Sequence, residues 1–433
     1  MKRAKNIALP YAETFADAKA GLPGSGLPWL VTLRADAAGH LAENGLPSRK
    51  VEAWKYTNLT ALAESALCAP EPDSAVPDDL PQIEGTHRLI FVGGRYRADL
   101  SDGALPTVCT LINALDSKDD WLEANLGRIA KPNGHAVVNA NTAFMNDGCV
   151  LRLTEGAKLD RPLHLVFASV GSAGGVAAHH PRILIVAGKD SQAEIIESHV
   201  GTGAYWANPV TEIEVGAGAQ VRHIKVQADS LDATHLAYTR AVVATGGRFD
   251  SFVMTTGAAL SRSEIDVVLD GEDANCRLDG IYLLRGSQHA DIATYIDHAK
   301  PRCDSDETYK GVLDGNSRGI FQGKIRVAPD AQQTNGNQLS RAILLSDGAE
   351  MNAKPELEIY ADDVKCSHGA TTGELDDDSM FYLRARGIPE DTARHLLVRA
   401  FIGEIVDEIE TPGTRNYMEK LVENWLSKRG DAQ

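Results

Sequence analysis

Short runs of β-branched and other apolar residues alternate with Gly, Asp and Asn turns from about residue 134 to residue 364. Long amphipathic helices are hard to find in this region, so its more than 200 residues are typical of strand and turn. The turn glycines 188, 216, 246 and 271 follow one another at spacings of 28, 30 and 25 residues. One turn of a parallel β-helix uses about 20 to 30 residues, so this repeat predicts a β-solenoid. An antiparallel sandwich, with hairpins every 8 to 12 residues or so, is the alternative.

The pattern before this region is mixed and mainly helical. Apolar positions at helical spacing predict a short helix over residues 12–20, a longer one over 29–44 that ends before Gly45, and another over 119–129. Residues 89–92 read as a strand that precedes a Gly-Gly turn, and the Pro- and acid-rich residues 69–86 read as a linker.

After Gly373 the pattern becomes helical again. Three acidic residues at 376–378 predict a helix N-terminus, and Gly387 is expected to end that helix. A second helix follows Pro389 and is expected to stop at Pro412, and residues 416–427 form a third. We therefore expect three domains: a mixed, mainly helical domain over 1–130, a β-helix core over 131–373, and a helical domain over 374–433. We expect the last domain to cover the exposed edge of the final turn.

Composition limits the classes of function. The chain has 433 residues and a formal net charge of −17, which argues against nucleic-acid binding and against an anionic membrane surface. Six cysteines without framework spacing fit a reducing cytoplasm better than secretion. No apolar segment follows the charged first residues as in a signal peptide, and no run of about 18 apolar residues predicts a membrane span.

Cys366 and His368 are the only close Cys/His pair in the chain. Alternating apolar residues lead into them, so a continuing strand would place both side chains on one face. A thiolate and an imidazole suit zinc, copper or iron-sulfur species, but two donors do not complete a tetrahedral site. A metal or cluster site here needs ligands from a second chain. The alternative is a buried cysteine beside a hydrogen-bonded surface histidine.

The second half of the chain contains an ordered set of motifs: Tyr309-Lys-Gly-Val-Leu313, Gly319-Ile-Phe-Gln-Gly-Lys-Ile-Arg-Val327, Ala331-Gln-Gln-Thr334, Leu344-Leu-Ser346, the stretch from Lys354 to Thr371, and Phe381-Tyr-Leu-Arg-Ala-Arg-Gly387. Together these motifs resemble the SufB/SufD family of the SUF iron-sulfur cluster assembly system. The segment from Ser48 to Leu59, with its Glu-Ala-Trp-Lys-Tyr sequence, resembles the N-terminal signature of the SufD branch.

This resemblance implies a right-handed parallel β-helix, mainly β overall, with helical domains on both sides. It implies a non-catalytic scaffold in the cytoplasm that pairs with a SufB-like paralogue through the β-helix end and with a SufC-like ATPase on the C-terminal helices. Cys366 and His368 then map onto a transient iron-sulfur cluster or iron site shared at the subunit interface. No Gly-x-x-x-x-Gly-Lys-Ser/Thr sequence is present, so we expect no ATP site on this chain.

Two other interpretations remain open. A β-helix polysaccharide lyase or hydrolase needs carboxylates that converge in a groove, and the candidates are Asp266, Asp270, Asp273 and Asp279. A purely structural homodimer without metal is the other, and a homodimer of the isolated chain is compatible with the scaffold function as well.

Overall fold

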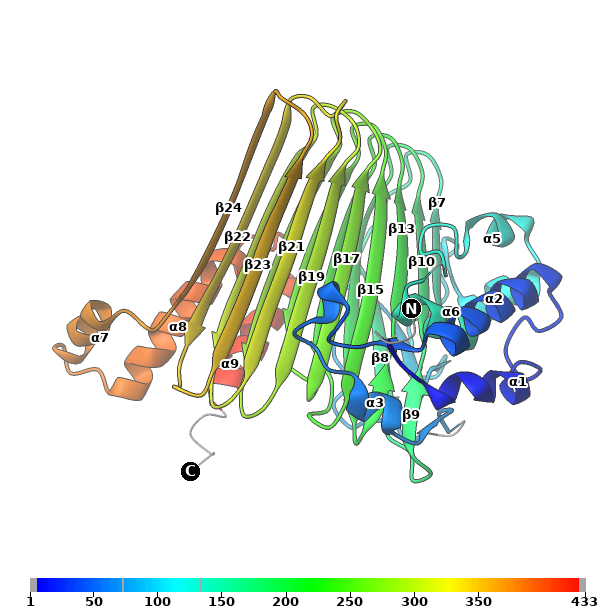
Figure 1. Ribbon diagram of the computed structural model, residues 1–433, viewed down its shortest axis with the longest axis horizontal. Helices are drawn as coiled ribbons and strands as arrows, with labels where there is room; N and C mark the ends of the chain where they lie inside the picture. Colours follow the sequence, from blue (N-terminus) through cyan, green and yellow to red (C-terminus); the bar gives the residue numbers. More distant parts are fainter. Residues whose placement is uncertain (1–5, 72–73, 133, 428–433) are drawn as a thin grey trace.

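A computed structural model describes residues 6–71, 74–132 and 134–427 of the chain. Its centre is a β-solenoid of about seven turns, built from two parallel sheets that face each other (Figure 1). The prediction of a mainly β, parallel β-helix core is confirmed, and the antiparallel sandwich is wrong. Gln220 pairs with Gln192 on one side and with Arg248 on the other, a period of 28 residues.

The ten-stranded sheet contains every second strand of the solenoid. Its order is β24-β22-β20-β18-β16-β14-β11-β8-β4-β5, parallel except for the last pair. The strands are β4 (His87–Val92), β5 (Arg95–Tyr96), β8 (Leu163–Val170), β11 (Gln192–Thr202), β14 (Gln220–Ala228), β16 (Arg248–Thr255), β18 (Asn275–Leu284), β20 (Asp304–Leu313), β22 (Thr334–Leu344) and β24 (Val364–Gly373).

The twelve-stranded sheet has the main order β23-β21-β19-β17-β15-β13-β10-β7-β6, with β12, β9 and β3 attached at its side. The strands are β3 (Leu67–Cys68), β6 (Val108–Thr110), β7 (Gly148–Leu153), β9 (Val176–His179), β10 (Arg182–Ala187), β12 (Tyr205–Ala207), β13 (Val210–Val215), β15 (Thr234–Val243), β17 (Leu260–Leu269), β19 (His289–His298), β21 (Arg318–Val327) and β23 (Glu350–Ile359). The short strands β1 (Asn6–Ile7) and β2 (Leu46–Pro47) pair separately.

The glycines that gave the predicted repeat lie at one corner of the solenoid. Each follows a strand of the twelve-stranded sheet, and the turns stack on one another. A Cβ added to Gly216 would lie 2.7 Å from the carbonyl oxygen of Ala187 in the turn below, and one on Gly188 would lie 2.7 Å from that of Leu153. Glycine is needed here because the backbones of successive turns approach too closely for a side chain.

The N-terminal elements pack on the outer face of the twelve-stranded sheet and around its first strands (Figure 1). They are η2 (Pro10–Thr14), α1 (Phe15–Ala18), α2 (Pro28–Asn44), η3 (Glu52–Trp54), α3 (Thr60–Glu64), α4 (Leu111–Ser117), α5 (Asp120–Asn125) and α6 (Ala136–Phe144). The helix predicted over 29–44 and the strand over 89–92 are confirmed, whereas the helix predicted over 119–129 is shorter.

Helix α6 was not predicted. Its sequence, Ala-Val-Val-Asn-Ala-Asn-Thr-Ala-Phe, has β-branched residues and no polar face, and every residue in it except Ala136 is buried. It lies between α2 and the sheet, so tertiary packing overrides a weak local helix preference. Strand β4 from the N-terminal part pairs with β8 of the solenoid. The domain boundaries themselves stay a prediction.

Three C-terminal helices follow the last strand: α7 (Asp377–Arg384), α8 (Glu390–Val406) and α9 (Pro412–Ser427). Pro412 begins α9 rather than stopping α8, because a first-turn proline needs no backbone partner. Helices α8 and α9 pack on the outer face of the ten-stranded sheet, against apolar residues such as Ile224, Phe252 and Ile281. The expectation that they cover the final turn is therefore wrong. Among the described residues, no helix combines the length and apolar character needed to cross a bilayer.

Candidate functional site

Cys366 and His368 lie on β24, the edge strand of the ten-stranded sheet. Cys366 is half-buried and packs against the apolar interior of the solenoid, whereas His368 is exposed. Alternation along the strand places both side chains on the interior-facing side, as the sequence predicted. The interior is open here because no further turn of the described chain covers it.

The neighbouring strand shapes the surroundings of the Cys366 thiol. Burial raises the pKa of Cys366, and a hydrogen bond from the backbone N–H of Gly336, its register partner on β22, opposes that increase. A Cβ on Gly336 would lie 3.4 Å from Ser305 Oγ and 3.6 Å from His298 Nε2. The sulfur therefore sits over a small gap with polar groups beneath it, and the N–H of Gly336 favours its thiolate form.

A buried polar pair lies beside this gap. Glu307 on β20 and Gln338 on β22 are 2% and 3% exposed, and the Gln338 amide Nε2 donates a hydrogen bond of 2.6 Å to Glu307 Oε2. His368 is the next residue in the same register column. Sequence reasoning missed both residues, because they lie about 30 and 60 positions from His368 and only the strand register aligns them.

Both edge strands at this end of the solenoid are unpaired on their outer side in the described chain. The backbone N–H groups of Glu350 and Tyr360, at the two ends of β23, donate to the neighbouring backbone at β21. Backbone direction alternates along a strand, so the nitrogen of Pro355, an odd number of residues from both, faces the unpaired outer side. Proline is tolerated at such a place because no ladder hydrogen bond is lost. Ile359 and Tyr360 are 40% and 59% exposed beside this edge. The edge is a surface to which another polypeptide can add.

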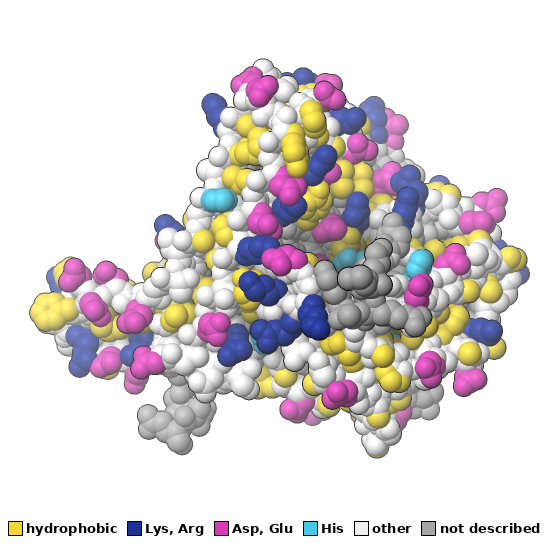
Figure 2. All heavy atoms as spheres, in the orientation of Figure 1, with side chains coloured by type: hydrophobic (Ala, Val, Ile, Leu, Met, Phe, Trp, Pro, Cys, Tyr) yellow, Lys and Arg dark blue, Asp and Glu magenta, His cyan; other side chains and the backbone are white. Residues whose placement is uncertain are grey.

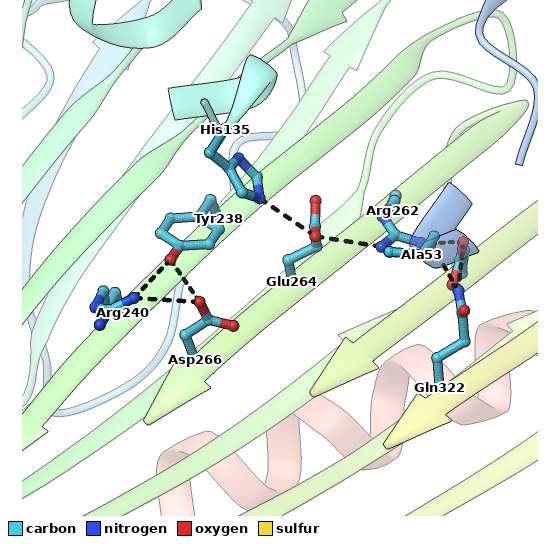
Figure 3. A network of polar contacts seen from close by, with 9 residues as sticks. Ala53, His135, Tyr238, Arg240, Arg262, Glu264, Asp266 and Gln322 are labelled. Carbon is cyan, nitrogen blue, oxygen red and sulfur yellow. Dashed lines mark hydrogen bonds and ion pairs between the residues drawn. The ribbon is translucent and has the colours of Figure 1, made fainter. Parts of the chain in front are cut away.

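The segment that resembles the SufD signature lies across the outer face of the twelve-stranded sheet. Trp54 is buried, with the Arg262 guanidinium 4.1 Å from its ring centroid. Gln322 Nε2 donates to the carbonyl oxygen of Ala53 at 3.2 Å (Figure 3). Lys354 on the edge strand forms an ion pair with Glu52 at 3.0 Å. These contacts fasten the N-terminal part to the strands that approach the open end.

Arg262 belongs to a wider polar network on that face. It pairs with Glu264, which also contacts His135 of the segment before α6 at 3.3 Å (Figure 3). Burial alone would lower the pKa of His135, but the Glu264 carboxylate raises it. Arg262 also pairs with Asp291, which accepts a hydrogen bond from Thr57. The network joins the N-terminal elements to the solenoid, which is a structural role.

Helix α7 and the start of α8 project beyond the solenoid (Figure 1). Phe381, Tyr382 and Leu396 on this projection are 75%, 55% and 44% exposed. Figure 2 shows apolar and acidic atoms together at its tip. An isolated helical hairpin with large apolar side chains in solvent is typical of a docking surface.

The four carboxylates considered for a lyase or hydrolase do not converge. Asp266 is hydrogen-bonded by Tyr238 on the outer face of the twelve-stranded sheet, whereas Asp279 pairs with Arg277 on the opposite side of the solenoid. Asp273 pairs with Arg302 in an exposed turn, and Asp270 is in the same turn. No group of three or more potential metal ligands occurs among the described residues. Cys366 and His368 are thus two donors that a second chain would have to supplement.

Comparisons with known proteins agree with this architecture. The family model described as "SUF system FeS cluster assembly, SufBD core domain" matches residues 169–401, and the model described as "SufBD protein N-terminal region" matches residues 5–165. A SufBD family iron-sulfur cluster assembly protein of Synechocystis is 34% identical over 91% of this chain and 90% of its own length.

Two relatives carry the SufD name. The iron-sulfur cluster assembly protein SufD of Escherichia coli is 30% identical over 87% of this chain and 88% of its own length. The SufD protein of Bacillus subtilis is 23% identical over 91% and 93%, respectively. The chain belongs to the SufB/SufD family, in its SufD branch, and has a role in iron-sulfur cluster assembly.

Proposed function

We propose that this chain is a non-catalytic, cytoplasmic scaffold subunit of the SUF complex that pairs with a SufB-like paralogue through the open end of its solenoid. The observation that carries the proposal is the position of Cys366 and His368 on the interior face of an unpaired edge strand. A second chain that adds to β23 and β24 would cover both side chains and could bring its own ligands to them.

The cargo in this proposal is an iron-sulfur cluster, or iron, held transiently between the subunits. A thiolate and an imidazole are suitable donors for iron, and the Gly336 N–H supports the thiolate of Cys366. An incomplete donor set in one chain suits a site that forms on assembly and opens again on release. In isolation, a second copy of this chain could cover the same edges.

A SufC-like ATPase is proposed to dock on the C-terminal helices. The exposed apolar side chains of α7 and α8 support this assignment, because large apolar side chains in solvent are typical of a docking surface and α7 extends beyond the solenoid (Figure 1). Movement of a docked ATPase would then be transmitted to the solenoid through α8 and α9, which pack directly on the ten-stranded sheet.

The test is cluster assembly on the complex reconstituted with both partners. His368→Ala should reduce cluster yield severely, because the described part of the chain holds no group of three or more potential ligands from which the lost donor could be replaced. It should cost at most about 1 kcal/mol of folding stability at an exposed site. His40→Ala, a change at another exposed histidine on α2, is the matched control and should leave the yield unchanged.

Cys366→Ser should also reduce cluster yield, but with a larger stability cost of about 1–2 kcal/mol, since it places a hydroxyl against the apolar interior. Urea unfolding of each variant separates the two effects. Normal cluster yield from a folded His368→Ala complex would show that this histidine is not a ligand.

A further inference from the structure

The interior of the last turns contains a hydrogen-bond acceptor that has no donor. The Gln338 amide nitrogen donates to Glu307, and above about pH 7, where Glu307 is ionised, this bond fixes the amide orientation because a carboxylate can accept a hydrogen bond but cannot donate one. The amide oxygen must then point elsewhere. Within the described residues no hydrogen-bond donor reaches Gln338 Oε1, although the atom is buried. An unpaired buried carbonyl is unfavourable, so a partner is expected in solution.

His368 is placed to be that partner. It is the register neighbour of Gln338 on β24, and neighbouring strands are about 4.8 Å apart, so side chains on the same face stack. The imidazole is exposed and is free to turn toward the interior. On the other side, Gln338 is held by the strand pairing with β20 and by its bond to Glu307.

The opposite sheet leaves room for this arrangement. A Cβ on Gly323 of β21 would lie 2.1 Å from Gln338 Nε2, so the Gln338 side chain extends across the interior only because residue 323 is glycine. The hydrogen bond to Glu307 and the space left by Gly323 therefore hold the Gln338 amide in place beneath the edge strand.

We propose that Gln338 is a positioning residue for His368: its amide oxygen accepts the N–H of one imidazole nitrogen and thereby directs the other nitrogen outward, toward the cargo. This inference rests on the proposed function of His368 as a donor. A hydrogen bond at one ring nitrogen selects a single tautomer, and metal-binding histidines are generally oriented by such an acceptor. Glu307 acts one step further away by fixing the Gln338 amide.

The test measures the tautomer of His368 in the full-length chain without partners or metal. Long-range ¹H–¹⁵N correlation spectra of ¹⁵N-histidine-labelled protein at about pH 8.5, where ordinary imidazoles are neutral, distinguish the two tautomers. The His368 signal is assigned by its loss in His368→Ala, and the exposed His40 provides an internal reference. We expect a single dominant tautomer for His368 in the wild type.

Gln338→Met keeps the size of the side chain but removes the acceptor. It should lower the His368 tautomer ratio about fivefold, toward that of His40, as expected for the loss of one neutral hydrogen bond. Gln220→Met, at an exposed glutamine on β14, should change nothing. The double variant Glu307→Gln with Gln338→Glu exchanges the donor and the acceptor of the hydrogen bond between positions 307 and 338. Position 338 still presents an oxygen to His368, so His368 should show the single dominant tautomer of the wild type.

A wild-type ratio equal to that of His40, or a ratio unaltered by Gln338→Met, would overturn the proposal. If Gln338→Met does not fold, Gly323→Ala replaces it as the test, because the added methyl group crowds the Gln338 amide without deleting it. Gly323→Ala should lower the His368 tautomer ratio, and an unaltered ratio would overturn the proposal equally. A tautomer that depends on Gln338, together with normal cluster yield from His368→Ala, would support the positioning contact while contradicting the ligand role.

Discussion

At the scale of single residues, the open end of the solenoid combines groups with different tasks. His368 is exposed and contributes little to the fold, whereas Cys366 is half-buried and packs against the solenoid interior. Glu307 is fully enclosed, and burial raises its pKa to about 7, despite a hydrogen bond from Gln338 that lowers it. Glu307 is thus a buried carboxyl group beside the candidate site whose ionised form is unfavourable for the fold.

Replacing Glu307 should change how stability depends on pH. Below its ordinary pKa of 4.5, Glu307 holds a proton in both the folded and unfolded states. Between pH 4.5 and about 7 only the folded state retains the proton, so stability falls as pH rises through this range. Glu307→Gln should remove this loss, which amounts to up to about 3 kcal/mol.

Urea unfolding at acidic and mildly alkaline pH measures the effect. Glu307→Gln should be more stable than the wild type on the alkaline side, and Glu123→Gln, at an exposed site on α5, should follow the wild type. Equal slopes against pH for wild type and Glu307→Gln would contradict the raised pKa.

At the scale of elements, the two helical regions serve the solenoid in different ways. The N-terminal segment that contains Trp54 is fastened across one sheet by Arg262 and Gln322. Helices α8 and α9 cover the apolar outer face of the other sheet. Deleting the C-terminal helices would expose that face, so a truncated chain is expected to aggregate. The docking role of α7 and α8 is better tested by surface substitutions.

Leu396→Glu combined with Phe381→Glu should abolish co-purification of the SufC-like ATPase, because charged side chains would replace the exposed apolar contacts of the proposed interface. Thermal stability should change little, since both residues are exposed. Leu231→Glu, at a residue that is 59% exposed in a turn of the solenoid, is the control. Undiminished ATPase binding by the double variant would place the contact elsewhere.

At the scale of the whole molecule, the solenoid is asymmetric. N-terminal strands and helices surround its first turns, whereas β23 and β24 leave the last turn open (Figure 1). Pairing through the open end would cover the long edge strands β23 and β24 and leave only short strands, such as β5 and β6, as sheet edges in the described chain, which favours a dimer over a filament. This asymmetry favours a defined complex with one solenoid partner.

Ile359→Lys should weaken that pairing, because a lysine beside an edge strand opposes the addition of another chain. Analytical ultracentrifugation should show a shift toward monomer for the chain alone and a lower affinity for the SufB-like partner. Leu231→Lys should pair like the wild type. If Ile359→Lys pairs with unchanged affinity while remaining folded, the open end is not the interface.

The sequence by itself determined the repeat and the placement of Cys366 and His368 on one strand face. Turn glycines predicted a solenoid because their spacings of 28, 30 and 25 residues match the length of one β-helix turn, and at Gly188 and Gly216 the close approach of successive backbones excludes a side chain. Cys366 and His368 were predicted to share a face because alternation along a strand is a local property. The SufD-like signature was also visible as a motif, although its role in fastening the N-terminal segment was not.

Only the tertiary structure decided which distant residues meet. Turn lengths vary, so the register shifts by 26 residues between β15 and β17 but by 32 between β21 and β23. The column from Glu307 through Gln338 to His368 depends on those lengths and leaves no local pattern. Helix α6 and the position of α8 and α9 on a sheet face, rather than over the open end, depend on which apolar surfaces remain uncovered once the solenoid has formed.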